Sequence, residues 1–474
     1  MRKRLTWSVV LVWLIVAFAS SGPAATDELS AKAVSAGISP TTIDAFKAAL
    51  AEGGFNIREW GYGEVDVAQL VCSRKLPSGY GNNAGGNYLA ITFDIDGVIA
   101  PRQFQLRPTD AVVLIGRTPP PVAYFSYRTY LFKHNYEGQP EPQVIFASLG
   151  DTLNNLVIKP GGSSGDPYNK NVVVISTADQ GTDARVRSAA MSVGISPNIM
   201  NTDVIPSSVV KLGLGPESDK FILLNRLTLP AYGHEQDLIE YMQNPGMTVL
   251  HLTPKQSGAA PPDPFPTPVL RVRGTGMTEA DLMPSVEKLR QAILAAYPGY
   301  QATEFTTQVW INEWLDGIQR EVNILGETRD TSYLCTSTNF TLANNVDEFL
   351  VVYGVNHQAT GKATYSSFSV YQQPKELGIS GLNSPGFAGS AADYIPQDSN
   401  VPFLYAWKAA RNCGDDAKCL KIALPEGLPP CPVVNLNKDL FVGFRAYLEP
   451  ETAVGPATSE ILYDRVIKFT KISN

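Results

Sequence analysis

Apolar residues recur at helical spacing in two distant segments of the chain. The segment DAFKAALAEGGF (44–55) has this spacing and ends at two glycines, which are typical of a helix stop. The segment EKLRQAILAAYPGY (287–300) has the same character and also ends in a turn followed by an aromatic residue. Both segments are predicted to be helices with one apolar face.

Short runs rich in Val, Ile, Phe and Tyr, bounded by glycine and proline, predict strands in much of the remaining sequence. One strand–loop–strand pattern is DAVVLIGRTPPPVAYFSYRTY (110–130), and another is DEFLVVYGVNHQATGKATYSSFSVY (347–371). Both contain Asp, an apolar strand, Gly, a loop, Ala and then Tyr-x-Ser-aromatic-x-x-Tyr. The second pattern is therefore interpreted as a copy of the first.

Two further matches follow in the same order along the chain. The segments 178–185 and 410–418 match after an apolar strand, and 219–230 matches 439–450 through Asp, Phe, a late Arg, Leu and Pro. Ordered matches of this kind indicate an internal duplication.

The predicted halves cover 38–252 and 277–474, joined by a proline-rich segment, 253–276, that is expected to be an extended linker. Each half combines one or two helices with several strands. We therefore predict an α+β fold of two similar domains, each a mainly antiparallel sheet packed with helices. A ligand site is expected at the cleft between them, because ligand sites favour domain interfaces.

The first 25 residues have the pattern of a secretory signal peptide. A basic start, 2–4, precedes a short apolar core, 7–19, and no later apolar run approaches the ~20 residues that span a bilayer. Removal of 1–25 changes the net charge from −7 to about −10 and leaves no long basic cluster. The expected protein is soluble, secreted or periplasmic, with no membrane insertion and no nucleic-acid partner. Its oligomeric state is left open.

Export makes disulfides possible for the five cysteines, Cys72, Cys335, Cys413, Cys419 and Cys431. Cys413 and Cys419 flank GDDAK and could close a small loop, or either could pair with Cys431. The odd number leaves at least one thiol unpaired or intermolecular. Because no CxxC motif or clustered histidines accompany them, no metal or other cofactor is expected.

The loop of the second copy, VNHQATGK (355–362), differs most from its counterpart RTPPP in the first. It is not a Walker loop, because the glycine spacing is wrong and a strand follows instead of a helix. It carries Asn356, His357 and Lys362, and Tyr365 follows it. His357, Tyr365 and Lys362 are the candidate catalytic residues, with His357 or Tyr365 moving a proton. Asn356 would orient a substrate.

The repeated tyrosines are candidates for substrate binding. Alternate residues of a strand share a face, so Tyr124 and Tyr130 lie together in the first copy and Tyr365 and Tyr371 in the second. A face that is both aromatic and polar suits the wall of a cleft. The alternatives are a solvent-facing strand and a domain interface.

Arg226 and Arg445 recur late in matching strands, each among large apolar residues that require the guanidinium to have a partner. That partner is either a structural carboxylate, such as Asp464 or Glu460 for Arg445, or an anionic substrate held bidentately. The two strands differ by one residue between Phe and Arg. One arginine therefore faces the other way, unless a bulge restores its direction.

Two functional hypotheses follow from these features. The first is an exported hydrolase or lyase with a single site at the inter-domain cleft, acting on a carboxylated extracellular compound or a glycan. The alternative is a non-catalytic secreted or periplasmic protein that binds a small molecule or glycan through the paired tyrosine faces. An enzyme would depend on the 354–365 loop, whereas a binding protein would use both halves alike.

Overall fold

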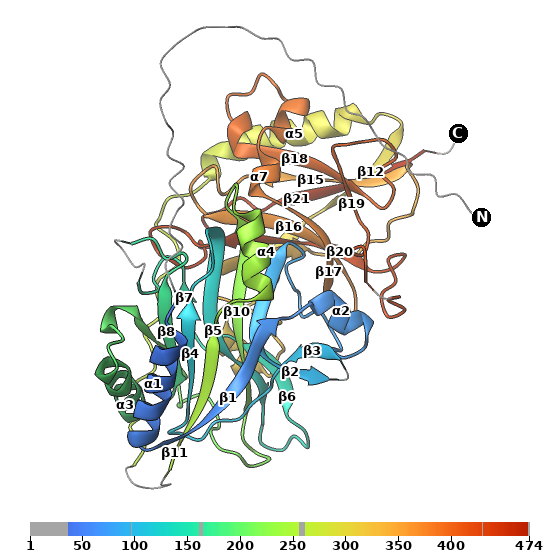
Figure 1. Ribbon diagram of the computed structural model, residues 1–474. Helices are drawn as coiled ribbons and strands as arrows, with labels where there is room; N and C mark the ends of the chain where they lie inside the picture. Colours follow the sequence, from blue (N-terminus) through green and yellow to red (C-terminus); the bar gives the residue numbers. More distant parts are fainter. Residues whose placement is uncertain (1–36, 96, 161–164, 256–260, 429, 473–474) are drawn as a thin grey trace, which may run out of the picture. The chain divides into compact units, whose positions relative to one another are not determined.

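A computed structural model of the protein (Figure 1) describes residues 37–474, except 96, 161–164, 256–260, 429 and 473–474. The predicted signal peptide, 1–25, lies outside the described residues. The described chain has an α+β fold that consists mostly of sheet, as the sequence predicts. Within these residues, no helix is long and apolar enough to cross a membrane.

The largest sheet has eleven strands, all from the first half of the chain. Its main path runs β6-β5-β10-β2-β1-β11-β4-β8-β9, while β3 pairs with β2 and β7 with β5. The strands are β1 (Phe55–Glu64), β2 (Gly86–Ile95), β3 (Val98–Pro101), β4 (Ala111–Arg117), β5 (Val122–His134), β6 (Gln143–Ala147), β7 (Leu153–Asn154), β8 (Asn171–Thr177), β9 (Met200–Val204), β10 (Lys220–Pro230) and β11 (Thr248–Pro254).

The second half forms two five-stranded sheets, in the orders β12-β21-β15-β18-β19 and β13-β14-β20-β16-β17. Their strands are β12 (Tyr300–Phe305), β13 (Thr307–Val309), β14 (Thr331–Thr336), β15 (Glu348–Val355), β16 (Tyr365–Gln372), β17 (Leu377–Asn383), β18 (Leu404–Ala410), β19 (Cys419–Lys421), β20 (Leu440–Tyr447) and β21 (Arg465–Lys471).

The strand order of the first half recurs in the second. The first part of β1 pairs with β11 and its last part pairs with β2, so this one strand joins two sheet segments. In the second half, β12 and β13 occupy these two positions as separate strands, and the sheet is divided between them. The pairs β8–β9 and β18–β19 are parallel, whereas the other pairs among the described strands are antiparallel.

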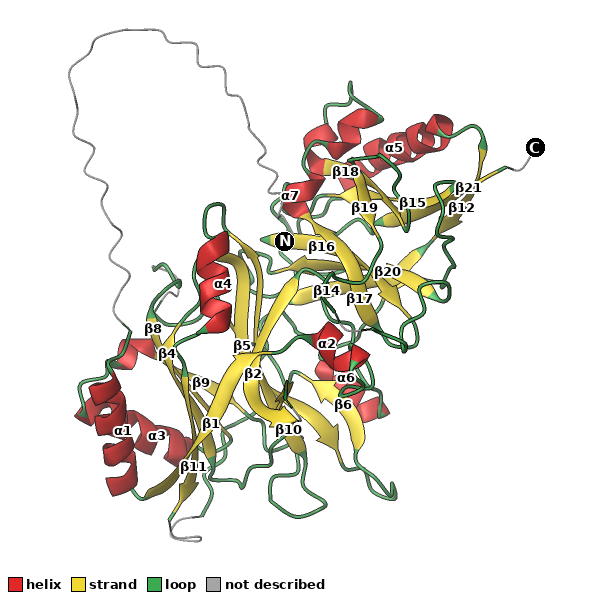
Figure 2. Cartoon of the chain, turned by 45° about the vertical axis from the view of Figure 1, so that its right-hand side comes forward, coloured by secondary structure: helices red, strands yellow, loops and turns green. Residues whose placement is uncertain are grey.

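Helices cover one face of a sheet segment in each half (Figures 1 and 2). In the first half, α1 (Pro40–Glu52) and α3 (Gln180–Ser192) pack against β4, β8 and β11. Helix α1 begins where the Ser39 hydroxyl accepts a hydrogen bond from the Thr42 amide, and it buries Phe46 and Leu50. In the second half, α5 (Met283–Ala296) packs against β15, β18 and β21.

The opposite faces of these segments pack on the other sheet segment of the same half, and each pair encloses a large apolar core. Each half therefore has three layers, with helices outside and two sheet segments within. Two further helices are α4 (Glu235–Gln243) and α7 (Ser384–Phe387), and there are short 3-10 helices, η2 (Pro197–Ile199), η3 (Ala280–Leu282), η4 (Ser390–Asp393) and η5 (Val401–Phe403).

One helix of each half packs against the core of the other half. Val71 of α2 (Val67–Cys72) lies in the core of the second half, and α2 lies beside β17 in both views (Figures 1 and 2). Trp314 and Ile318 of α6 (Trp314–Arg320) lie in the core of the first half, next to β6. We call residues 67–81 and 314–326 the exchanged segments.

After its helix, each exchanged segment continues through turns and bends that are hydrogen-bonded to the opposite half. The Gly81 amide donates to the Glu376 carbonyl at 2.9 Å, beside β17. Reciprocally, the Gly326 amide donates to the Phe146 carbonyl in β6 at 2.8 Å. Both glycines have positive φ, at 63° and 65°, a conformation that favours glycine. The two halves are therefore interlocked.

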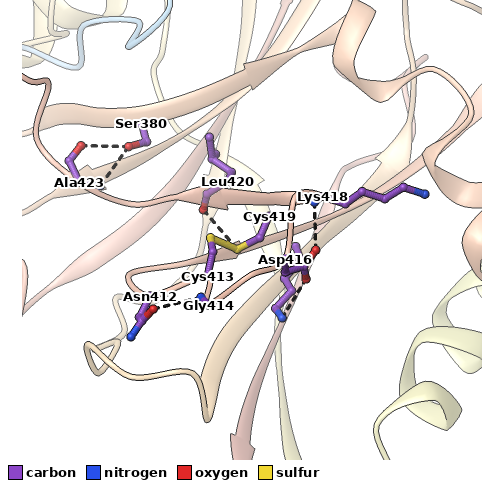
Figure 3. Close-up of a disulfide and its surroundings, with 10 residues drawn as sticks. Ser380, Asn412, Cys413, Gly414, Asp416, Lys418, Cys419, Leu420 and Ala423 are labelled. Atoms are coloured by element: carbon purple, nitrogen blue, oxygen red, sulfur yellow. Dashed lines mark hydrogen bonds and ion pairs between the residues drawn. A yellow bond between two sulfur atoms is a disulfide. The ribbon is translucent and has the colours of Figure 1, made fainter. Parts of the chain in front are cut away.

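Two disulfides are present, and the pairing differs in part from the sequence expectation. Cys413 pairs with Cys419, closing the short loop as one alternative predicted (Figure 3). Cys431 pairs with neither of these but with Cys72 at the end of α2, 359 residues away. Cys335 is the free, buried thiol. The small loop follows β18 at the place where α3 follows β8 in the first half.

Candidate functional site

The two recurring arginines occupy equivalent places in the fold. Arg226 pairs across the sheet with Ser126, and Arg445 pairs with Ser367. The pairing from Phe221 to Arg226 is regular, and the position of Phe441, opposite Tyr371, is taken in the first half by Ile222, opposite Tyr130. Both arginines consequently face the contact between the halves, but without a bulge between Phe and Arg: the sequence interpretation matched Phe221 with Phe441, one residue out of step.

Each arginine is anchored by a backbone carbonyl of the other half. Arg226 Nη2 donates to the Gly326 carbonyl, and Arg445 Nη2 donates to the Gly81 carbonyl. Arg445 also donates through Nη1 to the Tyr371 hydroxyl. The sequence suggested Asp464 or Glu460 as the carboxylate partner of Arg445. This suggestion is wrong, because a carbonyl oxygen and a phenol oxygen accept the hydrogen bonds of this guanidinium.

Aromatic rings surround both guanidinium groups. The Arg226 guanidinium carbon lies 5.1 Å from the ring centre of Tyr130 and 5.9 Å from that of Tyr88. The equivalent distances from Arg445 are 5.5 Å to Tyr371 and 5.4 Å to Tyr333. Rings at this range attract a cation through their π faces. The predicted binding residues thus form two matching pairs, Arg226 with Tyr130 and Arg445 with Tyr371.

A mostly apolar cavity of about 130 Å³ lies beside Arg226 and is partly open to solvent. Its walls come from both halves and from the exchanged segments, including Val65, Leu76, Phe93, Ala100, Ile222, Leu224, Ile311 and Leu325. Arg226 is the one arginine among the lining residues. Lys75 also lines the cavity, which therefore combines an apolar wall with two basic side chains.

Arg226 retains unused hydrogen-bonding capacity. In the part of the chain that the structure describes, its Nε has no hydrogen-bond partner and no carboxylate forms an ion pair with it. The guanidinium has five N–H donors, of which the Gly326 carbonyl takes one. A buried donor without a partner is costly, so this group is suited to receive an anionic oxygen.

A second, polar cavity adjoins the first, and Ile311 and Tyr333 line both. Glu327 lines this polar cavity and is 2% exposed. Its Oε1 accepts a hydrogen bond from the Ser148 hydroxyl at 2.8 Å, whereas Oε2 has no partner among the described residues. Burial raises the pKa of Glu327 to about 7, against the lowering effects of Ser148 and Arg226. Its carboxyl group therefore changes protonation near neutral pH.

His357, a predicted catalytic residue, lies in a buried network. Its Nδ1 is 2.9 Å from Glu279, and its Nε2 is 3.6 Å from Asp464. Burial alone would lower the pKa of His357, but Glu279 and Asp464 outweigh it and raise the pKa to about 10. The imidazole therefore carries its proton at neutral pH and does not accept another.

Lys362 belongs to the same network. Its ammonium donates to Glu449 and to Glu460, at 2.6 Å for the latter, and to the Met277 carbonyl at 2.9 Å. Asn356 is also engaged, because its side-chain amide donates to the Ser384 carbonyl at 3.3 Å. These contacts tie the 355–362 loop to neighbouring segments.

None of the residues Asn356, His357 and Lys362 lines the cavity beside Arg226. His357 and Lys362 thus lie near each other in the buried network, and this network is separate from the arginine–tyrosine pairs. Their proposed roles in proton transfer and substrate orientation stay predictions.

The other tyrosines meet at the contact between the halves. The ring of Tyr447 lies 4.6 Å from that of Tyr124 and 5.3 Å from that of Tyr365. The Tyr124 hydroxyl also donates to Asp330 at 2.9 Å. The tyrosine face is buried at the contact between the halves, so it is neither solvent-facing nor the wall of an open cleft.

The apolar residues of the cavity escaped the sequence interpretation, since they look like ordinary strand residues. One signal did exist. Gly81 and Gly326 are each followed seven residues later by Tyr-Leu, at Tyr88 and Tyr333. This fifth match marks the glycines that anchor the two arginines.

The chain matches no protein-family model and no curated protein.

Proposed function

We propose that the protein binds an amphiphilic organic anion, a small molecule with an apolar body and one acidic head group. The observation that carries this proposal is the apolar cavity beside Arg226, whose guanidinium lacks a carboxylate partner among the described residues. Concave, mainly apolar sites with a few placed polar groups are typical of small-molecule binding.

The chemistry of the lining selects the ligand class. Guanidinium recognises carboxylate, sulfonate or phosphate oxygens through directed N–H donors. The apolar walls favour a hydrophobic body, because burial contributes roughly 25 cal/mol per Å² of apolar surface. A bare inorganic anion would leave these walls without a partner.

Binding is favoured over catalysis by the titratable groups at the cavity. No His, Cys, Asp or Glu occurs among its described lining residues. Burial, assisted by Glu376, raises the pKa of the lining Tyr80 to about 12, so this phenol keeps its proton at neutral pH. The hydrolase or lyase hypothesis instead requires His357 and Lys362, which are held in the buried network.

We further propose that the protein is secreted or periplasmic. The two disulfides support an oxidising compartment. The pattern of a signal peptide in 1–25 is the second argument, and it comes from the sequence alone.

We also infer that the halves arose by internal duplication. The repeated strand order, the reciprocal exchanged segments and the matching arginine contacts support this inference. Chance recurrence of all three in one chain is a poor explanation.

Ligand titration with the whole protein tests the proposed function. Decanoate binding is measured by calorimetry, 8-anilinonaphthalene-1-sulfonate binding by fluorescence, and 1-decanol is the uncharged comparison. Arg226→Met should weaken decanoate about 10- to 100-fold, because charge-assisted hydrogen bonds are worth about 1.5–3 kcal/mol. It should change decanol binding little.

Arg58→Met is the matched control, since Arg58 is exposed on β1 and does not line the cavity. It should bind decanoate as the unaltered protein does. Equal decanoate affinity in the Arg226 and Arg58 variants, or no binding by the unaltered protein, would contradict the proposal.

A further inference from the structure

We infer that the second half contains an equivalent ligand site beside Arg445, and that the Trp310 indole fills it. The side chains at the equivalent positions Val65 and Trp310 would then decide how many ligands the chain binds. This inference rests on the proposed function for the nature of the ligand. The site beside Arg445 would take the same class of amphiphilic anion.

Val65 and Trp310 occupy equivalent positions. The Val65 amide donates to the Tyr88 carbonyl at 2.9 Å, and the Trp310 amide donates to the Tyr333 carbonyl at 3.0 Å. Tyr88 and Tyr333 are equivalent in turn, because each hydroxyl accepts a hydrogen bond from the amide five residues before it, at 2.8 and 3.1 Å. The match therefore depends on backbone geometry and not on similarity of side chains.

The side chains at these two positions have opposite effects. Val65 is small and lines the cavity beside Arg226. The Trp310 ring lies 5.0 Å from Tyr371 and 5.1 Å from Phe441, and the Arg445 guanidinium carbon lies 5.5 Å from its centre. The indole thus packs against Arg445, where the first half keeps open space.

A neighbouring glycine accommodates the indole. A Cβ atom on Gly443 would come within 2.8 Å of both Trp310 and Tyr371. The equivalent residue in β10 is Leu224, because Leu224 pairs with Ala90 two residues after Tyr88, as Gly443 pairs with Cys335 two residues after Tyr333. Leu224 lines the open cavity. Gly443 and Trp310 therefore fit each other, and together they close the second site.

A cation–π contact replaces the anion in the closed site. Trp is the aromatic side chain that attracts a guanidinium most strongly, and the indole excludes a second apolar ligand sterically. The two arginines therefore serve different purposes. Arg226 is available to a ligand, whereas Arg445 is held by Trp310, Tyr371 and the Gly81 carbonyl.

Exchange of the two side chains tests the inference. Calorimetry with decanoate should give one site per chain for the unaltered protein and two for Trp310→Val. Val65→Trp should lose the site beside Arg226, with at least a 10-fold loss of affinity. The double variant Arg226→Met, Trp310→Val should retain one site, which assigns that site to the second half.

Near-ultraviolet circular dichroism and thermal denaturation check that each variant is folded. A folded Trp310→Val protein that binds no more decanoate than the unaltered protein overturns the inference. If Trp310→Val does not fold, unchanged binding by folded Val65→Trp overturns it instead. If the unaltered protein binds nothing, the proposed function fails, but one site gained in Trp310→Val would still support the closed second site.

Discussion

Glu327 is a buried carboxyl whose protonation should change stability near neutral pH. Burial raises its pKa from the usual 4.5 to about 7. The folded state therefore holds a proton that the unfolded state releases, and stability falls as the pH rises from about 4.5 through 7. Glu327→Gln retains a carbonyl oxygen for Ser148 and does not ionise. It should be more stable than the unaltered protein at pH 8, by up to about 3 kcal/mol.

Urea denaturation at pH 5 and pH 8 measures this effect. The advantage of Glu327→Gln should be small at pH 5 and large at pH 8. Glu52→Gln, on the exposed end of α1, is the control for the loss of one carboxylate. An advantage that is equal at the two pH values would contradict the explanation.

His357 should show a dependence on pH in a higher window. Glu279 and Asp464 raise its pKa to about 10, above the usual 6.5. The stabilisation is therefore complete below pH 6.5 and is lost as the pH rises through 10. His357→Gln should lower the free energy of unfolding by about 3 kcal/mol or more at pH 6, because it breaks a buried ion pair. The loss should shrink towards pH 10.

Denaturation by guanidinium chloride between pH 6 and pH 10 checks this expectation. The control variant is His234→Gln, at the start of α4. A loss that is the same across this range would show that shape, and not charge, explains the effect of His357. This readout also bears on catalysis, because a histidine that stays protonated to about pH 10 is a poor general base at pH 7.

The sequence identified the two arginines but not their partners. Their recurrence in matching strands was visible, and the need for a polar partner followed from their apolar neighbours. The partners themselves are backbone carbonyls 100 and 364 residues away. A carbonyl by itself leaves no signal in the sequence, since every residue has one, and only the repeated spacing from Gly81 and Gly326 to Tyr-Leu marked these two. Carboxylates were therefore the natural but wrong suggestion for Arg445.

At the scale of elements, periodicity predicted the helices α1 and α5 and the strands β4, β5, β15 and β16. It could not predict their pairing. The strands β4 and β5 follow each other in the sequence, yet β4 pairs with β8 and β11 while β5 pairs with β6, β7 and β10. Local pattern determines the type of an element, whereas long-range packing selects its neighbours.

The short helices α2 and α6 also escaped prediction, and the segments that follow them contribute Leu76 and Leu325 to the cavity. Each is too short to show helical periodicity. Each packs on the opposite half, so the tertiary contact stabilises it more than its own propensity does. A site that depends on such elements is visible only in the folded chain.

At the scale of the whole molecule, the Cys72–Cys431 disulfide links an exchanged segment covalently to the opposite half. It joins α2 to the second half across 359 residues, whereas Cys413–Cys419 closes a loop across 6. The chain-entropy estimate gives about 6 kcal/mol for the long loop and about 2 kcal/mol for the short one. Loss of Cys72–Cys431 should therefore cost more stability and also loosen the wall of the cavity.

Two paired variants test this difference in guanidinium denaturation under oxidising conditions. Cys72→Ala with Cys431→Ala should lower the denaturation midpoint more than Cys413→Ala with Cys419→Ala, which serves as the matched control. Because Leu76 and Tyr80 follow α2 and line the cavity, the first pair should also weaken decanoate binding and the second should not. Equal losses of stability would mean that the packing of the exchanged segments, and not the covalent bond, holds the halves together.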